Sequence, residues 1–357
     1  MPLPTLTWEQ RFLGSITTTN TPLGVLTAVR DYLATNVSPG FHWSVTTDGL
    51  SNTEGSAVAP YLEITSSANV GGNPIKLLLA GSNSASFPAN DCFYGGNAGF
   101  GDYRPSGNRQ NAISVGIAPD GGTLSGPQTT ANPYGTARWS GYVKVVEPLT
   151  TTAQDNMWIV DSSECLAVFF EGSDSLLRGF IAGAMIAPLT DAAGQTIHNG
   201  VGRIYGVATI NAGQGLQNTW LQNPPTAQFL SSLSGSQNNN DQKYGQGISL
   251  CWDPDGNDLS HFAKWNDQPQ SQRSSTGQIN GSLMDASGNI AAVPIPVVNR
   301  STTTYVGDRL IGVLRQIKLI TPARARAVLQ DAAGNDVGYA MSPSLTVTRN
   351  AFAFTQS

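Results

Sequence analysis

The pentapeptide DAAGN occupies residues 331–335, and close variants stand at 191–195 (DAAGQ) and 285–289 (DASGN). In each copy the Asp side chain can accept hydrogen bonds from later backbone N–H groups, and the Gly supplies the positive φ that ends a tight turn. Each copy has a single acid, whereas a calcium site needs about six to eight oxygen ligands. Apolar runs flank every copy, so the stretch predicts a β-hairpin built on a type I turn with a glycine bulge.

Working outward from these turns, we predict a mainly β chain of antiparallel, sandwich-like or barrel-like domains, with a short N-terminal helix and long Gly- and Asn-rich loops. The helix is expected at 22–35, where Pro22 suits the first helical position and apolar residues recur at helical spacing. The predicted organisation is a helical arm at 1–40, a β-rich domain at 41–150 with a long loop at 82–110, a second β-rich domain at 151–343 and a C-terminal strand or arm at 344–357.

The chain carries little charge. Charged residues make up 12% of the 357 positions, against about 25% in an average soluble protein. The net charge of −5 gives no general attraction to nucleic acid or to an anionic membrane. A weakly charged surface suits a protein that packs against neighbours, because interface cores are depleted of charge. A secreted β protein rich in Thr, Gly and Asn has the same composition and stays as an alternative.

The cysteines and the first residues bear on where the chain is made. The start, MPLPTLTWEQRFLG, lacks the basic and then apolar pattern of a signal peptide. No run approaches the roughly 18 apolar residues of a membrane span. Cys92, Cys165 and Cys251 are widely spaced and odd in number, which argues against a zinc site and a disulfide framework. We therefore expect assembly in a reducing cytoplasm.

The string DPDGND at 253–258 is the strongest metal-like motif. Its oxygen-bearing side chains alternate as in a calcium loop, but the Gly stands fourth rather than sixth, and Lys264 occupies the position of the usual final Glu. An Asp-Gly hairpin tip is the preferred interpretation, and calcium binding is the alternative. His42, His198 and His261 form no metal-binding pattern.

A group of acids offers the one candidate for hydrolytic chemistry. Asp161, Glu164, Glu171 and Asp174 cluster in DSSECLAVFFEGSD, and glycoside hydrolysis uses a pair of carboxyl groups. Acids at the ends of a hairpin are the preferred interpretation. We accordingly predict no catalytic residue, no cofactor and no metal ligand.

Aromatic and arginine side chains provide the candidates for protein–protein contacts, because these residue types anchor interfaces. The terminal segments TLTWEQRFLGSI and SLTVTRNAFAFTQS place large apolar residues near the chain ends, where the partner is either the chain's own sheet or a neighbouring copy. We predict that both ends are assembly arms. The interface candidates are Trp8, Phe12, Phe93, Tyr94, Phe100, Tyr103, Arg104, Arg109, Phe352 and Phe354.

The helical segment LTAVRDYLATN at 26–36 leads directly into GFHWSV at 40–45, and it is followed by amide-rich strands and a long loop rich in Gly and aromatic residues. Together with the missing signal peptide, these features resemble the virion structural proteins of tailed bacteriophages, such as tail, neck, collar and baseplate components. The resemblance implies a non-enzymatic virion protein that is assembled in the host cytoplasm as a ring or tube of copies. It also implies contacts with other virion proteins, with no nucleic-acid specificity and no membrane insertion. A glycan-binding adhesin or receptor-binding module, or a glycan depolymerase, is the alternative.

Overall fold

The structure, a computed structural model, is mainly antiparallel β with one helix among the residues that it describes. These residues are 6–14, 22–35, 42–51, 61–70, 73–82, 112–118, 140–144, 156–171, 177–189, 192–193, 204–210, 246–252, 262–265, 292–299, 309–323, 326–342 and 349–356. The predicted mainly β fold with a short N-terminal helix is therefore confirmed.

Helix α1 (Pro22–Thr35) has the bounds predicted from the sequence. Proline suits its first position, because an N–H at that point has no partner inside the helix. The buried side chains follow a helical stripe and consist of Val25, Leu26, Val29 and Leu33. Leu23, which also fits the helical spacing, is 36% exposed.

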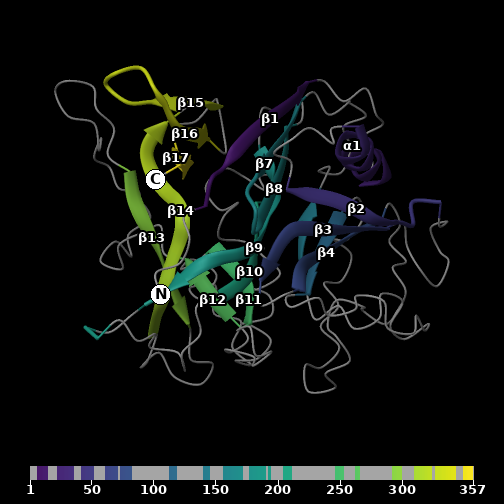
Figure 1. Cartoon of the computed structure of the whole chain (residues 1–357), viewed down its shortest axis with the longest axis horizontal. Helices are drawn as coiled ribbons and strands as arrows, with labels where there is room; N and C mark the ends of the chain where they lie inside the picture. Colours follow the sequence, from purple (N-terminus) through teal and green to yellow (C-terminus); the bar gives the residue numbers. More distant parts are fainter. Residues whose placement is uncertain are drawn as a thin grey trace.

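The smaller of the two sheets is a five-stranded antiparallel meander in which every strand pairs with the next one along the chain. Its strands are β2 (Trp43–Asp48), β3 (Tyr61–Val70), β4 (Asn73–Ser82), β5 (Ala112–Ala118) and β6 (Ser140–Lys144). Helix α1 packs against β2, β3 and β4 (Figure 1). One face of the sheet is thereby covered near its β2 edge.

The larger sheet is a strongly curled half-barrel of twelve strands in the described part of the chain. Its strands are β1 (Glu9–Gly14), β7 (Asn156–Asp161), β8 (Cys165–Glu171), β9 (Leu177–Pro188), β10 (Ile204–Ile210), β11 (Gln246–Trp252), β12 (Phe262–Trp265), β13 (Ala292–Asn299), β14 (Arg309–Ala323), β15 (Arg326–Gln330), β16 (Asp336–Met341) and β17 (Arg349–Thr355). Their order is β1-β7-β8-β9-β10-β11-β12-β13-β14-β17-β16-β15.

An additional pairing between β9 and β14 determines how this sheet curls. Pairing runs from β9 through β10, β11, β12 and β13 to β14 and then returns to β9, so these strands form a closed ring. The remaining strands extend from the ring as two layers, one made of β8, β7 and β1 and the other of β17, β16 and β15. These two layers face each other (Figure 1).

Unusual backbone angles mark both places where a strand changes its neighbour. β9 leaves β8 after Gly183 and then pairs with β14. Gly183 has φ +133°, and a Cβ there would overlap the carbonyl oxygen of Glu164. β14 leaves β9 after Leu314 and joins β17 at Ile317. Gln316, between these two pairings, has φ +54°, which is uncommon for a residue other than Gly.

Strands β7, β8 and β9 form a middle layer that is buried on both faces. Figure 1 shows β7 and β8 between the five-stranded sheet on one side and β14, β16 and β17 on the other. Alternate side chains of β8 enter opposite cores, with Leu166, Val168 and Phe170 in one and Ala167 and Phe169 in the other. This double burial explains why the sequence of β8, CLAVFFE, is an almost unbroken apolar run.

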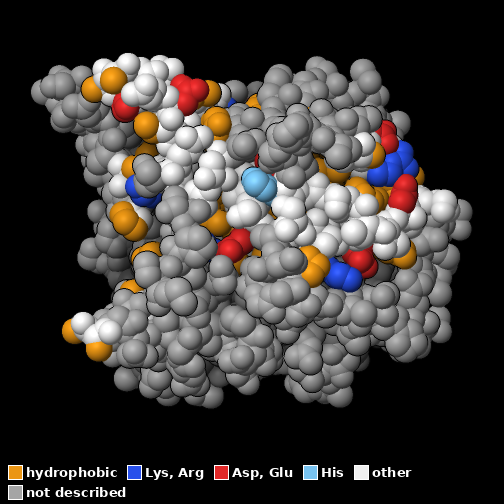
Figure 2. Space-filling view, viewed as in Figure 1, with side chains coloured by type: hydrophobic (Ala, Val, Ile, Leu, Met, Phe, Trp, Pro, Cys, Tyr) orange, Lys and Arg blue, Asp and Glu red, His pale blue; other side chains and the backbone are white. Residues whose placement is uncertain are grey.

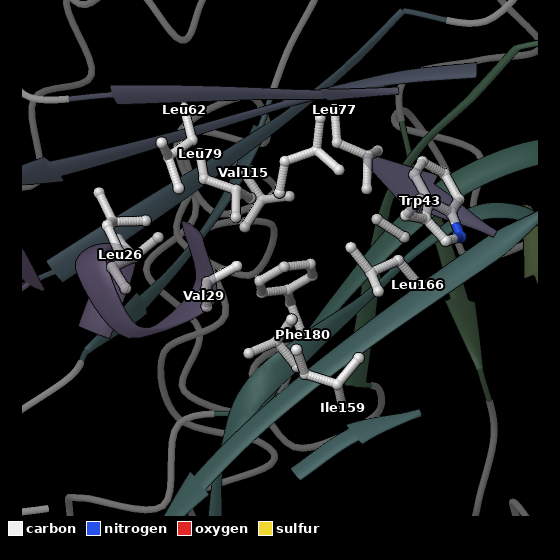
Figure 3. Close-up of a cluster of buried hydrophobic side chains, with 14 of the residues drawn as sticks. Leu26, Val29, Trp43, Leu62, Leu77, Leu79, Val115, Ile159, Leu166 and Phe180 are labelled. Atoms are coloured by element: carbon white, nitrogen blue, oxygen red, sulfur yellow. The ribbon is translucent and has the colours of Figure 1, made fainter. Parts of the chain in front are cut away.

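The first core lies between the middle layer, α1 and the five-stranded sheet. In Figure 3, Phe180 of β9 points from the middle layer toward Val115 of β5, and Leu26 and Val29 of α1 close one side. Trp43 of β2 lies at the opposite end of this core (Figure 3). The helix and both sheets therefore share one apolar interior.

The second core lies between the middle layer and strands β14, β16 and β17, and residues from both chain ends complete it. This corrects the prediction that the chain ends are assembly arms. β17 lies between β14 and β16 of its own sheet. Phe352 and Phe354 are 2% and 0% exposed, and Trp8 is 0% exposed. The rings of Trp8 and Phe354 make an edge-to-face contact with 5.0 Å between centroids. Large apolar side chains near a chain end need cover, and here the opposite end of the same chain supplies it.

The DAAGN stretch forms the predicted hairpin turn between β15 and β16. Asp331 Oδ1 accepts hydrogen bonds from the backbone N–H groups of Ala333 (2.8 Å) and Asn335 (2.9 Å). Gly334 has φ +84° and donates its N–H to the Asp331 carbonyl at 3.0 Å. Of the DAAGQ copy the structure describes Ala192 and Ala193, which are exposed and in a turn. The DASGN copy lies outside the described residues.

Candidate functional site

The acids that suggested hydrolytic chemistry lie at the two ends of strand β8. Asp161 ends β7, Glu164 lies in the β7–β8 turn and Glu171 ends β8. All three are buried, with exposures of 0%, 5% and 6%. Asp174 lies outside the described residues. Burial of three acids in an apolar layer requires partners, because an unpaired buried charge is strongly unfavourable.

Glu164 forms a buried ion pair with Arg315 of β14. The Arg315 and Glu164 side chains are only 3% and 6% exposed. Arg315 Nη1 also donates to the carbonyl oxygen of Ala184 in β9, at 3.0 Å. One guanidinium therefore joins the β7–β8 turn, β9 and β14 at the place where β9 and β14 pair.

Glu171 forms the second buried ion pair, with Arg326 of β15. Glu171 Oε2 also accepts a hydrogen bond from Asn156 Nδ2 at 3.0 Å. Arg326 donates from Nε to the Ser342 carbonyl at 3.0 Å, and its guanidinium carbon lies 5.2 Å from the centre of the Trp158 ring. This pair holds the β15–β16 hairpin against the far end of β7 and β8.

The spacing of Glu164 and Glu171 differs from that of the catalytic pair of a glycosidase. Glu164 and Glu171 are separated by the length of β8, which is roughly 23 Å at about 3.3 Å per residue. Paired catalytic carboxyl groups are about 5 to 10 Å apart. Asp161 lies nearer to Glu164, but it is fully buried and its Oδ2 accepts the backbone N–H of His42 at 3.2 Å. Glu164 and Glu171 each join strands that are far apart in the sequence, through their ion pairs with Arg315 and Arg326.

The β7–β8 turn also ties the first core to the middle layer. Trp43 Nε1 donates to the carbonyl oxygens of Ser162 (2.9 Å) and Cys165 (3.1 Å). Ser162 is fully buried, and its Oγ accepts the N–H of Cys165 at 3.1 Å. Burial raises the pKa of the Cys165 thiol to about 12, so the thiol is protonated at neutral pH and packs as an apolar side chain.

The exposed charges that the structure describes are sparse. On the face shown in Figure 2, blue and red side chains meet at the right-hand edge, over α1 and β2. Arg30 of α1 contacts its neighbour Asp31 at 2.8 Å and Asp48 of β2 at 3.1 Å. Such exposed pairs are typically worth less than about 1 kcal/mol.

Several predicted contact residues cannot be placed. Phe12 belongs to β1, where its backbone is opposite Trp158, but its side chain is not described. The string DPDGND at 253–258 and the loop at 83–111 lie outside the described residues. The loop carries the remaining interface candidates, which are Phe93, Tyr94, Phe100, Tyr103, Arg104 and Arg109.

The buried arginines Arg315 and Arg326 and the edge strand β15 were not predicted from the sequence. Arg315 stands inside the apolar run LIGVLRQIKLI, and a lone arginine in such a run is a signal of a buried ion pair. The partner could not be inferred, because Glu164 is 151 positions away. The sequence predicts β15 as the apolar segment before the DAAGN turn, but it does not predict that this strand lies at a sheet edge.

The described residues include no cluster of three or more metal-binding side chains. No helix among them is long and apolar enough to span a membrane. No model of a known protein family matches the chain, and no curated protein matches it in sequence. The geometry of the described residues must therefore support any functional proposal by itself.

Proposed function

We propose that the chain is a non-enzymatic structural component of a tailed-phage virion, placed in the tail, neck or baseplate region. It assembles with copies of itself into a ring or tube and contacts neighbouring virion proteins. Assembly takes place in the host cytoplasm.

The observation that carries this proposal is that charged side chains inside the molecule form buried ion pairs. The three described acids of this group are held in buried contacts. The ion pairs Glu164–Arg315 and Glu171–Arg326 link the two ends of β8 to β14 and β15. Burying an ion pair gains little net stability, but it fixes which groups meet, because a buried charge without its partner is strongly unfavourable. Charged groups used in this way favour a rigid building unit over an enzyme.

The low charge of the whole chain supports the same proposal. With 12% charged residues, copies brought close together repel one another weakly. The curled sheet also ends in strands β1 and β15, and the five-stranded sheet ends in β2 and β6. Sheet edges of this kind are places where another chain can add a strand.

Two experiments test the proposal. Mass photometry and negative-stain electron microscopy of the purified chain should show closed rings or short tubes at micromolar concentration. Immunogold labelling of intact particles of the phage that encodes the chain should mark the tail, neck or baseplate. A chain that is abundant in infected cells but missing from purified particles would contradict a virion role.

The rival functions give different results with the same purified protein. A glycan-binding module would bind oligosaccharides on a glycan array as a single chain. A depolymerase would release reducing sugar ends from a capsular polysaccharide, and Glu164→Gln or Glu171→Gln would abolish that release. Either result would replace the structural proposal.

A further inference from the structure

Strand β15 is a sheet edge in the described part of the structure. It is the last strand of the twelve-stranded sheet, and in the described part of the chain it pairs only with β16. The outer side of such a strand presents a row of backbone N–H and C=O groups that another strand can pair with. Figure 1 shows β15 at the upper left, on the side of the molecule away from the five-stranded sheet.

The edge also exposes an apolar side chain. Val328, at the centre of β15, is 46% exposed. Only Leu23 joins it among the large hydrophobic residues that the structure describes as exposed. Natural edge strands are usually protected by Lys, Pro or a bulge. β15 has neither Lys nor Pro. Its pairing with β16 is regular from Arg326 to Leu329, and the register shifts only between Leu329 and Gln330, next to the turn.

The strand is held firmly before any partner arrives. At one end Arg326 is bound by Glu171 and Ser342. At the other end the hydrogen-bonded Asp331 turn fixes the hairpin, and Gln330 Nε2 donates to Asp336 Oδ1 at 3.0 Å. A strand that is already ordered loses little conformational entropy when a second strand pairs with it.

The distribution of charge favours a second copy of the same chain as the partner. When a strand pairs with its own copy, any uncompensated charge meets a like charge close by. The single charged residue of β15 is Arg326, and Glu171 neutralises it inside the protein. In an antiparallel pair with Val328 on the two-fold axis, Val328 lies opposite Val328, and Ala327 lies opposite Leu329. The central contacts are therefore apolar.

We propose that two copies of this chain associate through their β15 strands, which pair antiparallel about a two-fold axis at Val328. The inference rests on the proposed self-assembly and names one contact surface for it. A two-fold contact of this kind joins two subunits, and in a ring of subunits it joins two rings back to back.

Cysteine cross-linking tests the register. Opposite residues of an antiparallel pair have Cα atoms about 4.5–5.5 Å apart, within the range that a disulfide can bridge. Val328→Cys should therefore form a covalent dimer under mild oxidation. Ala327→Cys alone and Leu329→Cys alone should not, whereas a mixture of these two variants should. Peptide mass spectrometry identifies the linked residues, and the wild-type chain reports any background from its own cysteines.

A charge substitution tests the same contact without cross-linking. Val328→Lys places two ammonium groups across the axis and should raise the dimer dissociation constant at least tenfold in analytical ultracentrifugation. Leu23→Lys, at the other large hydrophobic residue that the structure describes as exposed, is the matched control and should leave the constant unchanged. Circular dichroism of both variants verifies the fold.

The outcomes separate this inference from the proposed function. If the wild-type chain forms rings or tubes but Val328→Cys does not cross-link at position 328, the β15 contact is wrong and self-assembly stands. If the wild-type chain stays monomeric up to about 100 µM, both proposals are overturned. Cross-linking at 328 together with weakened association of Val328→Lys supports the β15 contact.

Discussion

Replacing Phe354 with Ala should strongly destabilise the isolated chain, because this side chain lies at the centre of the second core. Phe354 is 0% exposed, and its ring contacts those of Trp8 and Phe169 with centroid distances of 5.0 and 5.9 Å. The substitution removes most of a buried aromatic surface and leaves a cavity. It also breaks two edge-to-face pairs, each worth about 0.5–1.5 kcal/mol.

The expected loss of unfolding free energy is about 4 kcal/mol, within the range of about 3–5 kcal/mol for Phe→Ala in a well-packed core. Urea denaturation followed by tryptophan fluorescence measures it. With a denaturant slope of about 3 kcal/mol per molar urea, the unfolding midpoint should fall by roughly 1.3 M. Phe354→Leu, which keeps most of the apolar volume, should cost about 1.5 kcal/mol or less.

Leu23→Ala is the control for this measurement. Leu23 is 36% exposed on α1, and substitutions at such positions usually change stability by less than about 1 kcal/mol. If Phe354→Ala leaves the midpoint within about 0.3 M of wild type, the C-terminal strand does not belong to the core of its own chain. In that case the assembly-arm hypothesis would be reinstated.

Three further predictions concern buried or hydrogen-bonded ionisable side chains. Glu171→Gln leaves Arg326 buried without its counter-ion and should lower the free energy of unfolding in urea by about 3–5 kcal/mol. The double variant Glu171→Leu/Arg326→Met should recover most of this loss. Equal losses in the two variants would contradict a buried ion pair. The pKa of Asp331 lies below its ordinary value, so its contribution to the hairpin should be complete above the unfolded-state pKa and lost as the pH falls through the lower folded-state pKa. An NMR pH titration of residues 331–335 should show this, and Asp331→Asn should remove the dependence. The Cys165 thiol should resist alkylation at pH 8 in the folded chain and react after denaturation, and rapid modification detected by peptide mass spectrometry would show that it is not buried.

The local features of the fold were predictable because neighbouring residues determine them. The DAAGN turn combines an Asp that accepts backbone hydrogen bonds with a Gly at positive φ. Helix α1 combines Pro22 at its first position with apolar residues at helical spacing. Neither feature depends on contacts with distant parts of the chain.

The place of the terminal strand was not predictable in this way. The alternation of Phe352 and Phe354 shows that β17 has one apolar face, but it does not show which sheet covers that face. The answer depends on Trp8, from the other end of the chain. A preference for an external partner was therefore wrong for a physical reason, since the pattern records the need for burial and not its location.

Of the candidate site, only the acidic residues were predictable from the sequence. Their presence in DSSECLAVFFEGSD is visible in the sequence, but a catalytic pair and two structural ion pairs give the same local pattern. The difference lies in Arg315 and Arg326, which meet the acids only after the curled sheet has formed. Strand β8 likewise lacks strand-like alternation because both of its faces are buried.

Hydrogen–deuterium exchange of the purified chain, read by mass spectrometry, tests the central claim most directly. That claim is that β7, β8 and β9 form a middle layer which the two chain ends help to enclose. Peptides covering 156–171 and 177–187 should exchange most slowly, and the peptide covering 349–356 should be protected to a similar level. Exchange of 349–356 within seconds, while 156–171 stays protected, would contradict this account.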